Sequence, residues 1–396
     1  MSYIVQKFGG TSVATLERIR NVADIVARTV KLQKKNPVVV VSAMAGVTNK
    51  FIKFVNEMGI FEGDAEYDQV VSSGEFVTAG LVAIALRNVG IGARSFAAWQ
   101  VPIITDANYG RAVIGSIDPN GIRKNLENGV VPVICGFQGI SPEKKITTLG
   151  RGGSDLTAVA VASAIAAELC EIYSDVDGVY TTDPNFFPEA RKIEEISYQE
   201  MLEMSMHGAK VLQAQSVEYA RRHNMVIRVA SSFVDNGGTT ISHKISPKPF
   251  CALAVTHNLS FIKIVHEKEG DIDEIVKILQ MHVVQVIHKK ILQNGSHKFI
   301  IVVDKKQTDF IMNLLSGMSF VSSVGREMVR KSFSQINVIG TAALANVSNH
   351  LIGELKKSRI DAFIGSSSPF RIGLIVPSDK LIDAVDALHK YCGLSA

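Results

Sequence analysis

A regular alternation of short apolar runs with helical patterns over the first 232 residues constrains the fold more than any other feature. The strand patterns lie at 3–8, 37–42, 93–97, 131–137, 171–174 and 226–231, and the helical patterns at 14–34, 67–89, 155–169, 197–206 and 209–223. Strands that are separated by helices of about ten residues or more pair in parallel, because parallel neighbours need a long crossover connection. We therefore predict a three-layer αβα domain with a mostly parallel central sheet over residues 1–232.

The pattern changes after residues 233–250, FVDNGGTTISHKISPKPF, where a glycine pair and two prolines predict a linker. Two shorter rounds follow it, the first in the order strand, helix, strand, strand, helix, strand and the second in the same order up to its second helix. They predict two ferredoxin-like (βαββαβ) modules over 251–330 and 331–396. The predicted strands are 261–266, 283–291, 297–303, 319–324, 334–340, 360–365 and 370–376, and the predicted helices are 270–282, 305–316, 343–358 and 378–391.

Charge and cysteine usage narrow the class of protein. The 42 Lys and Arg residues are scattered and nearly balanced by 38 Asp and Glu, so we expect no nucleic-acid partner. The four cysteines lie far apart without metal-ligand spacing, which is typical of buried thiols in a reducing compartment. Apolar runs such as VVVV at 38–41 are far shorter than the ~20 residues of a membrane span. We expect a cytoplasmic protein that makes no membrane contact.

The stretch VQKFGGTS at 5–12 is a strand that breaks into two glycines next to a cation. Gly9 and Gly10 would let main-chain N–H groups approach an anion closely, and Lys7 would add a positive charge. A simple strand-to-helix turn with an exposed lysine is the alternative. Because the pattern GxxxxGK[ST] is absent, a Walker-type nucleotide site is not expected.

A second glycine turn, TTLGRGGSD at 147–155, precedes an alanine-rich helical pattern. The planar fork of Arg151 suits a carboxylate or a phosphate, and Ser154 or Asp155 is predicted to cap the helix. A well-capped buried helix after a flexible loop would explain the same residues.

An acidic stretch, YSDVDGVYTTDPN at 173–185, follows a predicted strand. Asp175 and Asp177 are candidate ligands for a hard cation, although an acidic surface turn is an equally good interpretation because an EF-hand spacing is lacking. The other polar candidates are Ser42, Thr48, Glu75 and Lys210.

Taken together and in order, six motifs resemble those of the aspartokinases, members of the amino-acid kinase family. They are KFGGTS (7–12), VVVVSAMAGVTN (38–49), SSGE (72–75), TTLGRGGSD (147–155), YSDVDGVYTTDP (173–184) and GAKVL (208–212). The two C-terminal modules resemble a pair of ACT domains in element order.

The resemblance implies transfer of the ATP γ-phosphate to the β-carboxylate of L-aspartate, which gives 4-phospho-L-aspartate. This is the first step toward diaminopimelate, lysine, threonine and methionine. One alternative is another amino-acid kinase that acts on glutamate, acetylglutamate or a nucleoside monophosphate. The other is a catalytically weak protein that serves as an amino-acid-binding module.

The resemblance also implies residue roles. Lys7 and Lys210 would flank the transferring phosphoryl group, and Asp155 would hold both lysines. The implied ATP-binding residues are Lys7, Phe8, Gly9, Gly10, Ser174, Asp175, Tyr180 and Lys210. The implied substrate-binding residues are Ser42, Thr48, Glu75 for the α-amino group, Arg151 for the α-carboxylate, Gly152, Gly153 and Ser154. Mg²⁺ would enter with ATP, and no general base is needed because the acceptor carboxylate is already ionised. Association into a homo-oligomer through the ACT-like modules is expected.

The chain departs from the family pattern at several points. Asn185 stands where the family has an arginine after TTDP, so a cation near the nucleotide is missing. The stretches HEKEGDID at 266–273 and TAALANVS at 341–348 lack the Pro-Gly pair that ACT domains carry there, and GSSSPFR at 365–371 replaces an STSE-like stretch. We therefore predict weak or absent feedback inhibition by lysine or threonine.

Overall fold

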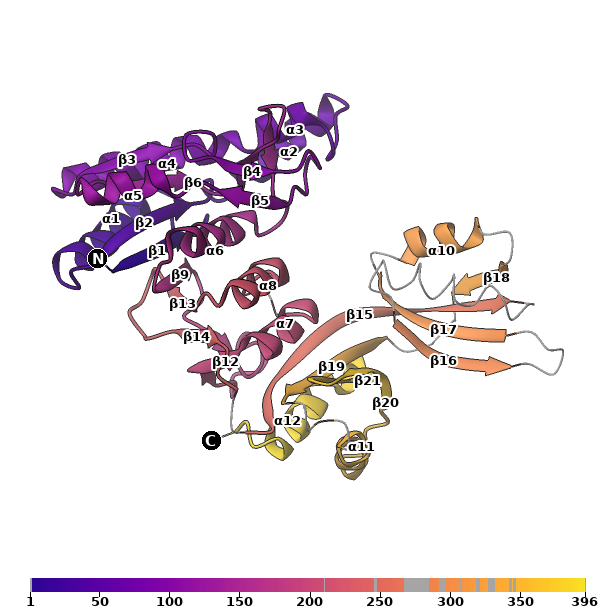
Figure 1. Cartoon of the computed structure of the whole chain (residues 1–396). Helices are drawn as coiled ribbons and strands as arrows, with labels where there is room; N and C mark the ends of the chain where they lie inside the picture. The colour runs from indigo at the N-terminus through magenta and orange to yellow at the C-terminus, as the bar shows by residue number, and fades with distance from the viewer. Residues whose placement is uncertain are drawn as a thin grey trace. The chain divides into compact units, whose positions relative to one another are not determined.

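The computed structural model describes residues 2–209, 211–245, 248–266, 285–291, 297–305, 308–317, 321–326, 332–341, 344 and 347–395. Its contacts divide the chain into two units (Figure 1). The first comprises Met1–Val179, Lys192–Ser205 and Lys210–Ile245, and the second Tyr180–Arg191, Met206–Ala209 and Ser246–Ala396.

The central sheet of the first unit has the strand order β12-β14-β13-β9-β1-β2-β6-β3. Six of these strands are the predicted ones, and they pair with one another in parallel. They are β1 (Tyr3–Phe8), β2 (Asn36–Val41), β3 (Ala93–Phe96), β6 (Val131–Cys135), β9 (Leu169–Ser174) and β13 (Ile227–Ser231). The prediction of a mostly parallel sheet is therefore confirmed.

Two further strands extend this sheet beyond the predicted set. β14 (Thr239–Ser242) lies within the proposed linker and pairs antiparallel with β13, and β12 (Glu195–Ser197) pairs with β14 in parallel. The buried Ile241 side chain explains why this part of a glycine-rich segment joins the sheet.

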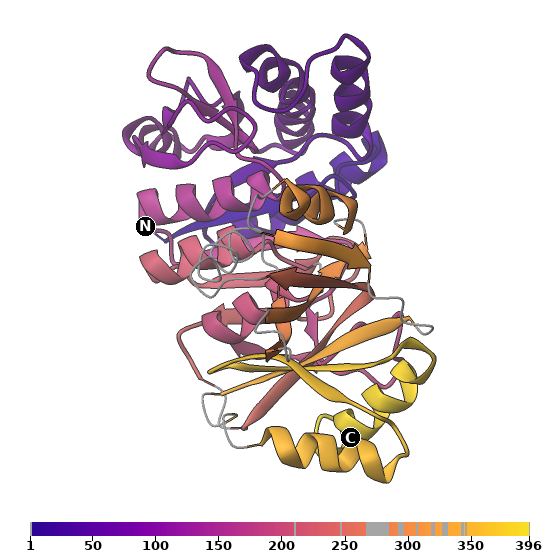
Figure 2. The ribbon, with the colours of Figure 1, turned by 90° about the vertical axis from the view of Figure 1, so that its right-hand side faces the viewer.

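Helices cover the sheet in layers (Figure 2). α1 (Leu16–Lys31) and α4 (Ser73–Asn88) share one apolar core with Val39, Val41 and Val133 of the strands. α6 (Gly153–Ile165) packs on β1, β2 and β9, and α8 (Ala214–His223) packs on α6. The remaining helices are α2 (Val47–Glu57), α3 (Ala65–Val71), α5 (Asn120–Glu127) and α7 (Tyr198–Met206).

The predicted helix 67–89 is two helices, α3 and α4, which meet at Ser72. The stretch Ala65–Asn88 is long and apolar enough to cross a membrane by length and composition. However, Val82 and Leu86 of α4 are completely buried in the core of the first unit, so this stretch belongs to the core of the domain.

A small second sheet, with the order β5-β4-β7-β8, was not predicted. Its strands are β4 (Ile103–Thr105), β5 (Ile114–Ile117), β7 (Gln138–Ile140) and β8 (Ile146–Thr148). Strands of three or four residues are too short to show a period-two pattern. Two other short strands are β10 (Val179–Tyr180) and β11 (Lys192–Ile193).

The second unit is built on an antiparallel sheet with the order β16-β17-β15-β19-β21-β20, in which β18 also pairs with β15. The strands are β15 (Phe250–His266), β16 (Gln285–Ile291), β17 (His297–Asp304), β18 (Val321–Arg326), β19 (Phe333–Gly340), β20 (Phe363–Ser368) and β21 (Arg371–Pro377). Helices α10 (Thr308–Ser316), α11 (Ser348–Lys357) and α12 (Leu381–Tyr391) and the 3-10 helix η4 (Ser378–Lys380) accompany them. This arrangement fits ACT-type modules, and the predicted helix 270–282 lies outside the described residues.

Strand β15 is much longer than the predicted strand 261–266 and serves both modules. Its first half pairs with β19, and its second half pairs with β17 and β18. The strand that pairs with β19 of the module predicted over 331–396 therefore lies almost entirely within the range predicted for the other module.

Candidate functional site

A cavity of about 730 Å³ lies in the first unit, where several segments that follow strands meet. Because parallel strands point their carboxyl ends to the same edge of a sheet, the segments after β1 and β2 come together there. The lining includes Lys7, Gly10, Ser42, Thr48, Glu75, Arg151, Gly152, Gly153, Ser154 and Asp155. Motifs that are separated by up to about 150 positions in the sequence thus form one site.

The first pair of charges in this cavity is Lys7 on β1 and Asp155 in the first turn of α6. Lys7 Nζ lies 2.5 Å from Asp155 Oδ1, and the two side chains are only 10% and 11% exposed. An ion pair that is this short and this well shielded from water fixes the ammonium group in place. Asp155 thus positions Lys7, whereas Lys210 lies outside the described residues.

Gly9 and Gly10 bring the end of β1 against neighbouring backbone. The Gly9 N–H donates to the Tyr173 carbonyl at 3.1 Å, so this donor is already used. A Cβ on Gly10 would lie 3.0 Å from the Ala43 carbonyl oxygen, so a larger residue would push the two loops apart. Phe8 is completely buried and stacks on Tyr173 with the ring centroids 4.9 Å apart, which leaves its backbone as the part near the site.

The prediction that Ser154 or Asp155 caps α6 is wrong. The N-cap is Gly152, which adopts φ 75° and ψ 11° and makes no side-chain capping bond. A left-handed residue at this position turns the chain so that Ser154 and Asp155 lie inside the first helical turn. A Cβ on Gly152 would lie 2.0 Å from Gln213 Cγ, so glycine is required by contact as well as by conformation.

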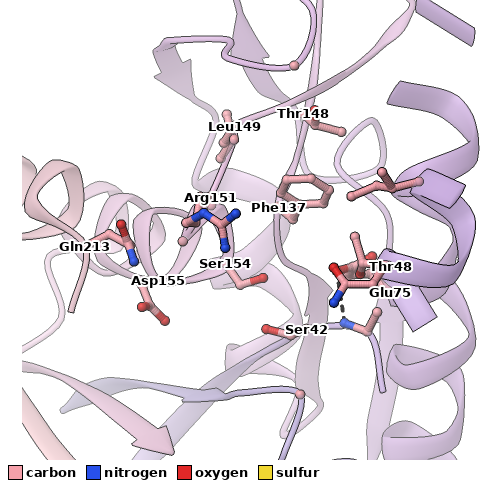
Figure 3. A pocket seen from close by; sticks show the side chains of 18 of the residues that line it. Ser42, Thr48, Glu75, Phe137, Thr148, Leu149, Arg151, Ser154, Asp155 and Gln213 are labelled. Carbon is pink, nitrogen blue, oxygen red and sulfur yellow. Dashed lines mark hydrogen bonds between the residues drawn. The ribbon is translucent and has the colours of Figure 1, made fainter. Parts of the chain in front are cut away.

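Glu75 lies in the first turn of α4 and is 2% exposed. Its Oε1 accepts a hydrogen bond from the Ala43 N–H at 2.9 Å (Figure 3), whereas Oε2 has no hydrogen-bond partner among the described residues. Burial raises the pKa of Glu75 to about 8, because the charged form loses its hydration. Oε2 is therefore the oxygen of Glu75 that is available to a ligand, and a positive charge beside it would favour the ionised form.

Arg151 lies on the turn between Gly150 and Gly152 and is exposed toward the cavity. Figure 3 shows Arg151 near Ser154 and Asp155, with Glu75 and Thr48 at the other end of the cavity. A cation and a buried carboxyl group at separate positions of one cavity suit a small ligand that carries both charges, such as an amino acid.

Five described residues that the sequence assigns to the nucleotide do not line this cavity, namely Phe8, Gly9, Ser174, Asp175 and Tyr180. Ser174 is the last residue of β9 and Asp175 follows it, and Ser174 Oγ accepts a hydrogen bond from the Val176 N–H. Tyr180 belongs to the second unit. Asp177 binds Lys192 at 3.2 Å and the Asn236 amide at 2.9 Å, which supports an acidic turn over a metal site.

The cavity also contains residues that the sequence did not single out, notably Phe137, Tyr67 and Gln213. Phe137 follows Gly136 at the end of β6 and has φ 68°, an unusual conformation for a bulky residue. At the rim, Arg111 Nε lies 2.7 Å from Glu62 Oε1. The position of Phe137 two residues after a buried strand was the available signal for it, whereas Gln213 and Tyr67 carried none.

Comparison with known proteins agrees with this geometry. The model of the amino acid kinase family matches residues 2–231. An aspartate kinase from Pseudomonas putida is 36% identical over the whole chain and 98% of its own length. An aspartokinase from Rickettsia bellii is 43% identical over 68% of each chain. The crystal structure of E. coli aspartokinase III in complex with aspartate and ADP superposes with a TM-score of 0.76 at 25% identity, over 98% of this chain and 99% of that one.

The family match covers the cavity and all strands of the central sheet except β14, and the curated relatives extend through the second unit. The chain therefore belongs to the amino acid kinase family and, within it, to the aspartokinases, which are phosphotransferases with a carboxyl group as acceptor.

Proposed function

We propose that the cavity of the first unit transfers the γ-phosphoryl group of ATP to the β-carboxylate of L-aspartate, giving ADP and 4-phospho-L-aspartate. The observation that carries this proposal is the presence of the Lys7–Asp155 pair, Glu75 and Arg151 in one cavity. The likeness to an E. coli enzyme whose structure contains aspartate and ADP supports the choice of ligands.

Aspartate would be held at its α-carbon by two opposite charges. The Arg151 guanidinium would bind the α-carboxylate in a bidentate way, and Glu75 would bind the α-ammonium group. The raised pKa of Glu75 supports this role, because an arriving ammonium group compensates the cost of ionising a buried carboxyl group. Ser42, Thr48 and Ser154 line the same cavity and would donate or accept hydrogen bonds around the side-chain carboxylate, against the backbone of Gly152 and Gly153.

Phosphoryl transfer to a carboxylate needs orientation and charge neutralisation more than covalent help from the protein. Lys7 would stabilise the negative charge that spreads over the transferring group, and Lys210 would act from the other side. Asp155 would keep Lys7 directed at that position. The nucleotide would extend toward Gly9, Gly10, Ser174 and Asp175, with Tyr180 assigned from the sequence motif. Mg²⁺ would enter bound to ATP and neutralise its phosphates.

Copies of the chain would associate through the second unit into a homo-oligomer. We further propose that the enzyme works in the cytoplasm and catalyses the first step toward the amino acids derived from aspartate. The departures from the ACT pattern at 266–273, 341–348 and 365–371 support weak or absent feedback inhibition. Asn185 would weaken ATP binding relative to the family arginine.

A substrate panel tests the reaction. ADP formation is followed with L-aspartate, L-glutamate, N-acetyl-L-glutamate or a nucleoside monophosphate as the acceptor. We expect ADP release that depends on aspartate and is at least tenfold faster than with the other acceptors. Faster ADP release with one of the others would overturn the proposal.

A further inference from the structure

Asp68 is a buried carboxylate beneath the cavity that the proposed reaction does not use. It lies on α3 and is 0% exposed, and it is not part of the cavity lining. A carboxylate is expensive to bury unless it accepts several hydrogen bonds, so its partners indicate its purpose.

Three hydrogen bonds end on this carboxylate. Oδ2 accepts from the Gly110 N–H at 2.9 Å and from the Thr148 N–H at 2.7 Å, and Oδ1 accepts from the Thr148 hydroxyl at 2.7 Å. Asp68 thereby ties α3 to the loop that carries Gly110 and to the last residue of β8. Only an acceptor-only group with two oxygens satisfies three donors in this way.

The turn that carries Arg151 starts at this point. The Thr148 carbonyl accepts a hydrogen bond from the Ala112 N–H at 2.9 Å, so both backbone groups of Thr148 are bound. Gly150 has φ 75°, and a Cβ there would lie 3.2 Å from the Gly110 carbonyl oxygen. The turn from Thr148 to Gly152, which carries Arg151, is therefore packed against the loop that Asp68 holds. Figure 3 shows Thr148, Leu149 and Arg151 of this turn.

We propose that Asp68 is a positioning residue for the substrate carboxylate, because it fixes the turn that presents Arg151 to the cavity. The inference rests on the proposed role of Arg151 in binding the aspartate α-carboxylate. If Asp68 no longer holds Thr148 and Gly110, the guanidinium samples more positions, and the loss falls on aspartate binding and spares the ATP side of the site.

The variant Asp68→Asn tests this directly. Asparagine has nearly the same shape, but its amide group turns two donors toward the donors of Thr148 or Gly110. We expect the KM for aspartate to rise about tenfold or more, which is the effect of losing about 1.4 kcal/mol of binding free energy. The KM for ATP and kcat should change less than about threefold. Thr148→Val removes one of the three bonds and should raise the aspartate KM by a smaller factor in the same direction.

Asp64→Ala is the matched control, since Asp64 is the N-cap of the same helix and its carboxylate accepts from the Glu66 N–H at 2.7 Å. This variant loosens α3 without touching the bonds of Asp68, so it should lower the melting temperature and leave both KM values unchanged. An equal rise of the aspartate KM in Asp64→Ala would assign the effect to general loosening of α3 and overturn the inference.

A double variant separates positioning from other roles. If Asp68 acts through Arg151, the double variant Asp68→Asn/Arg151→Ala should have nearly the same aspartate KM as Arg151→Ala alone. A fully additive effect, or an unchanged aspartate KM in both Asp68→Asn and Thr148→Val, would refute the inference. A wild-type protein that phosphorylates no aspartate would instead overturn the proposed function, so the two failures are distinguishable.

Discussion

Lys7 forms an ion pair with Asp155 in the protein without substrate, so its positive charge is already partly compensated. The two groups are 2.5 Å apart and shielded from water, so the lysine is held in one position. The carboxylate also weakens the electrostatic potential that Lys7 produces in the cavity. Phosphate oxygens that enter the cavity would bring further negative charge close to the Lys7 ammonium group, which would then stabilise them. Lys7 is therefore a fixed ammonium group that phosphate oxygens can approach, with Asp155 holding it in place.

Replacing Lys7 by alanine should lower turnover at least tenfold, which corresponds to about 1.4 kcal/mol of transition-state stabilisation. It also leaves Asp155 buried without its partner, so a lower melting temperature is expected. Initial rates are measured at a temperature where circular dichroism shows the folded protein, with the exposed Lys53→Ala as the control. Near-normal turnover would refute the role of Lys7.

Glu75 should make the stability of the protein depend on pH. Its pKa in the folded protein, about 8, is above the usual 4.5, so the folded state keeps a proton that the unfolded state has released. The stabilisation is therefore complete below pH 4.5 and is lost as the pH rises through about 8. The total is on the order of 5 kcal/mol.

The variant Glu75→Gln removes this dependence. As the pH rises from 5 to 8.5, the free energy of unfolding should fall for the wild type relative to that of Glu75→Gln. Denaturant unfolding at several pH values measures the difference, and Glu57→Gln, at an exposed carboxylate on α2, should follow the wild type. Parallel profiles for Glu75→Gln and the wild type would contradict the raised pKa.

At the scale of the element, the start of α6 depends on one glycine. Gly152→Ala places a Cβ in a left-handed residue and 2.0 Å from Gln213 Cγ. We expect a loss of about 1–3 kcal/mol in the free energy of unfolding. We also expect a higher aspartate KM, because Arg151 directly precedes this residue.

Gly80→Ala is the opposite case and serves as the control. Gly80 lies in the interior of α4, and a Cβ added there would meet no atom within 4 Å, so alanine should stabilise the helix by about 0.5–1 kcal/mol. Equal effects of the two substitutions on stability would show that the start of α6 does not need its glycine.

The elements that could be predicted are those whose own residues determine them. The continuous apolar runs of β2 and β6 mark buried parallel strands at almost the observed bounds, since such strands are apolar on both faces. The short strands β4, β5, β7 and β8 depend on pairing with one another and left no periodic signal. The cap of α6 was mispredicted because a left-handed glycine replaced the usual side-chain cap.

The same distinction holds for the site. Lys7, Glu75, Arg151 and Asp155 were found because each lies in a motif, and the sheet topology then brought them together. Asp68 was missed because its importance comes from contacts with residues 42 and 80 positions away, which no local pattern records.

At the scale of the whole molecule, the shared strand β15 gives the two modules of the second unit a common sheet. A change in either module can act on the pairing of the other through this strand. However, the turns that would hold an amino-acid effector depart from the ACT pattern in sequence.

Lysine and threonine, singly and together, should therefore reduce activity by less than twofold at 1 mM, about 0.4 kcal/mol of coupling. Initial rates at an aspartate concentration near its KM measure this effect. Strong inhibition at sub-millimolar effector would show that the altered turns still form a binding site.

The central claim is that this cavity phosphorylates the β-carboxylate of aspartate, and trapping the product tests it most directly. The protein is incubated with ATP, Mg²⁺, L-aspartate and hydroxylamine, and the hydroxamate is identified by mass spectrometry and NMR against both isomers. We predict aspartate β-hydroxamate in amounts equal to the ADP released, with much less product from Lys7→Ala. ADP release without hydroxamate, or an α-hydroxamate, would contradict the account.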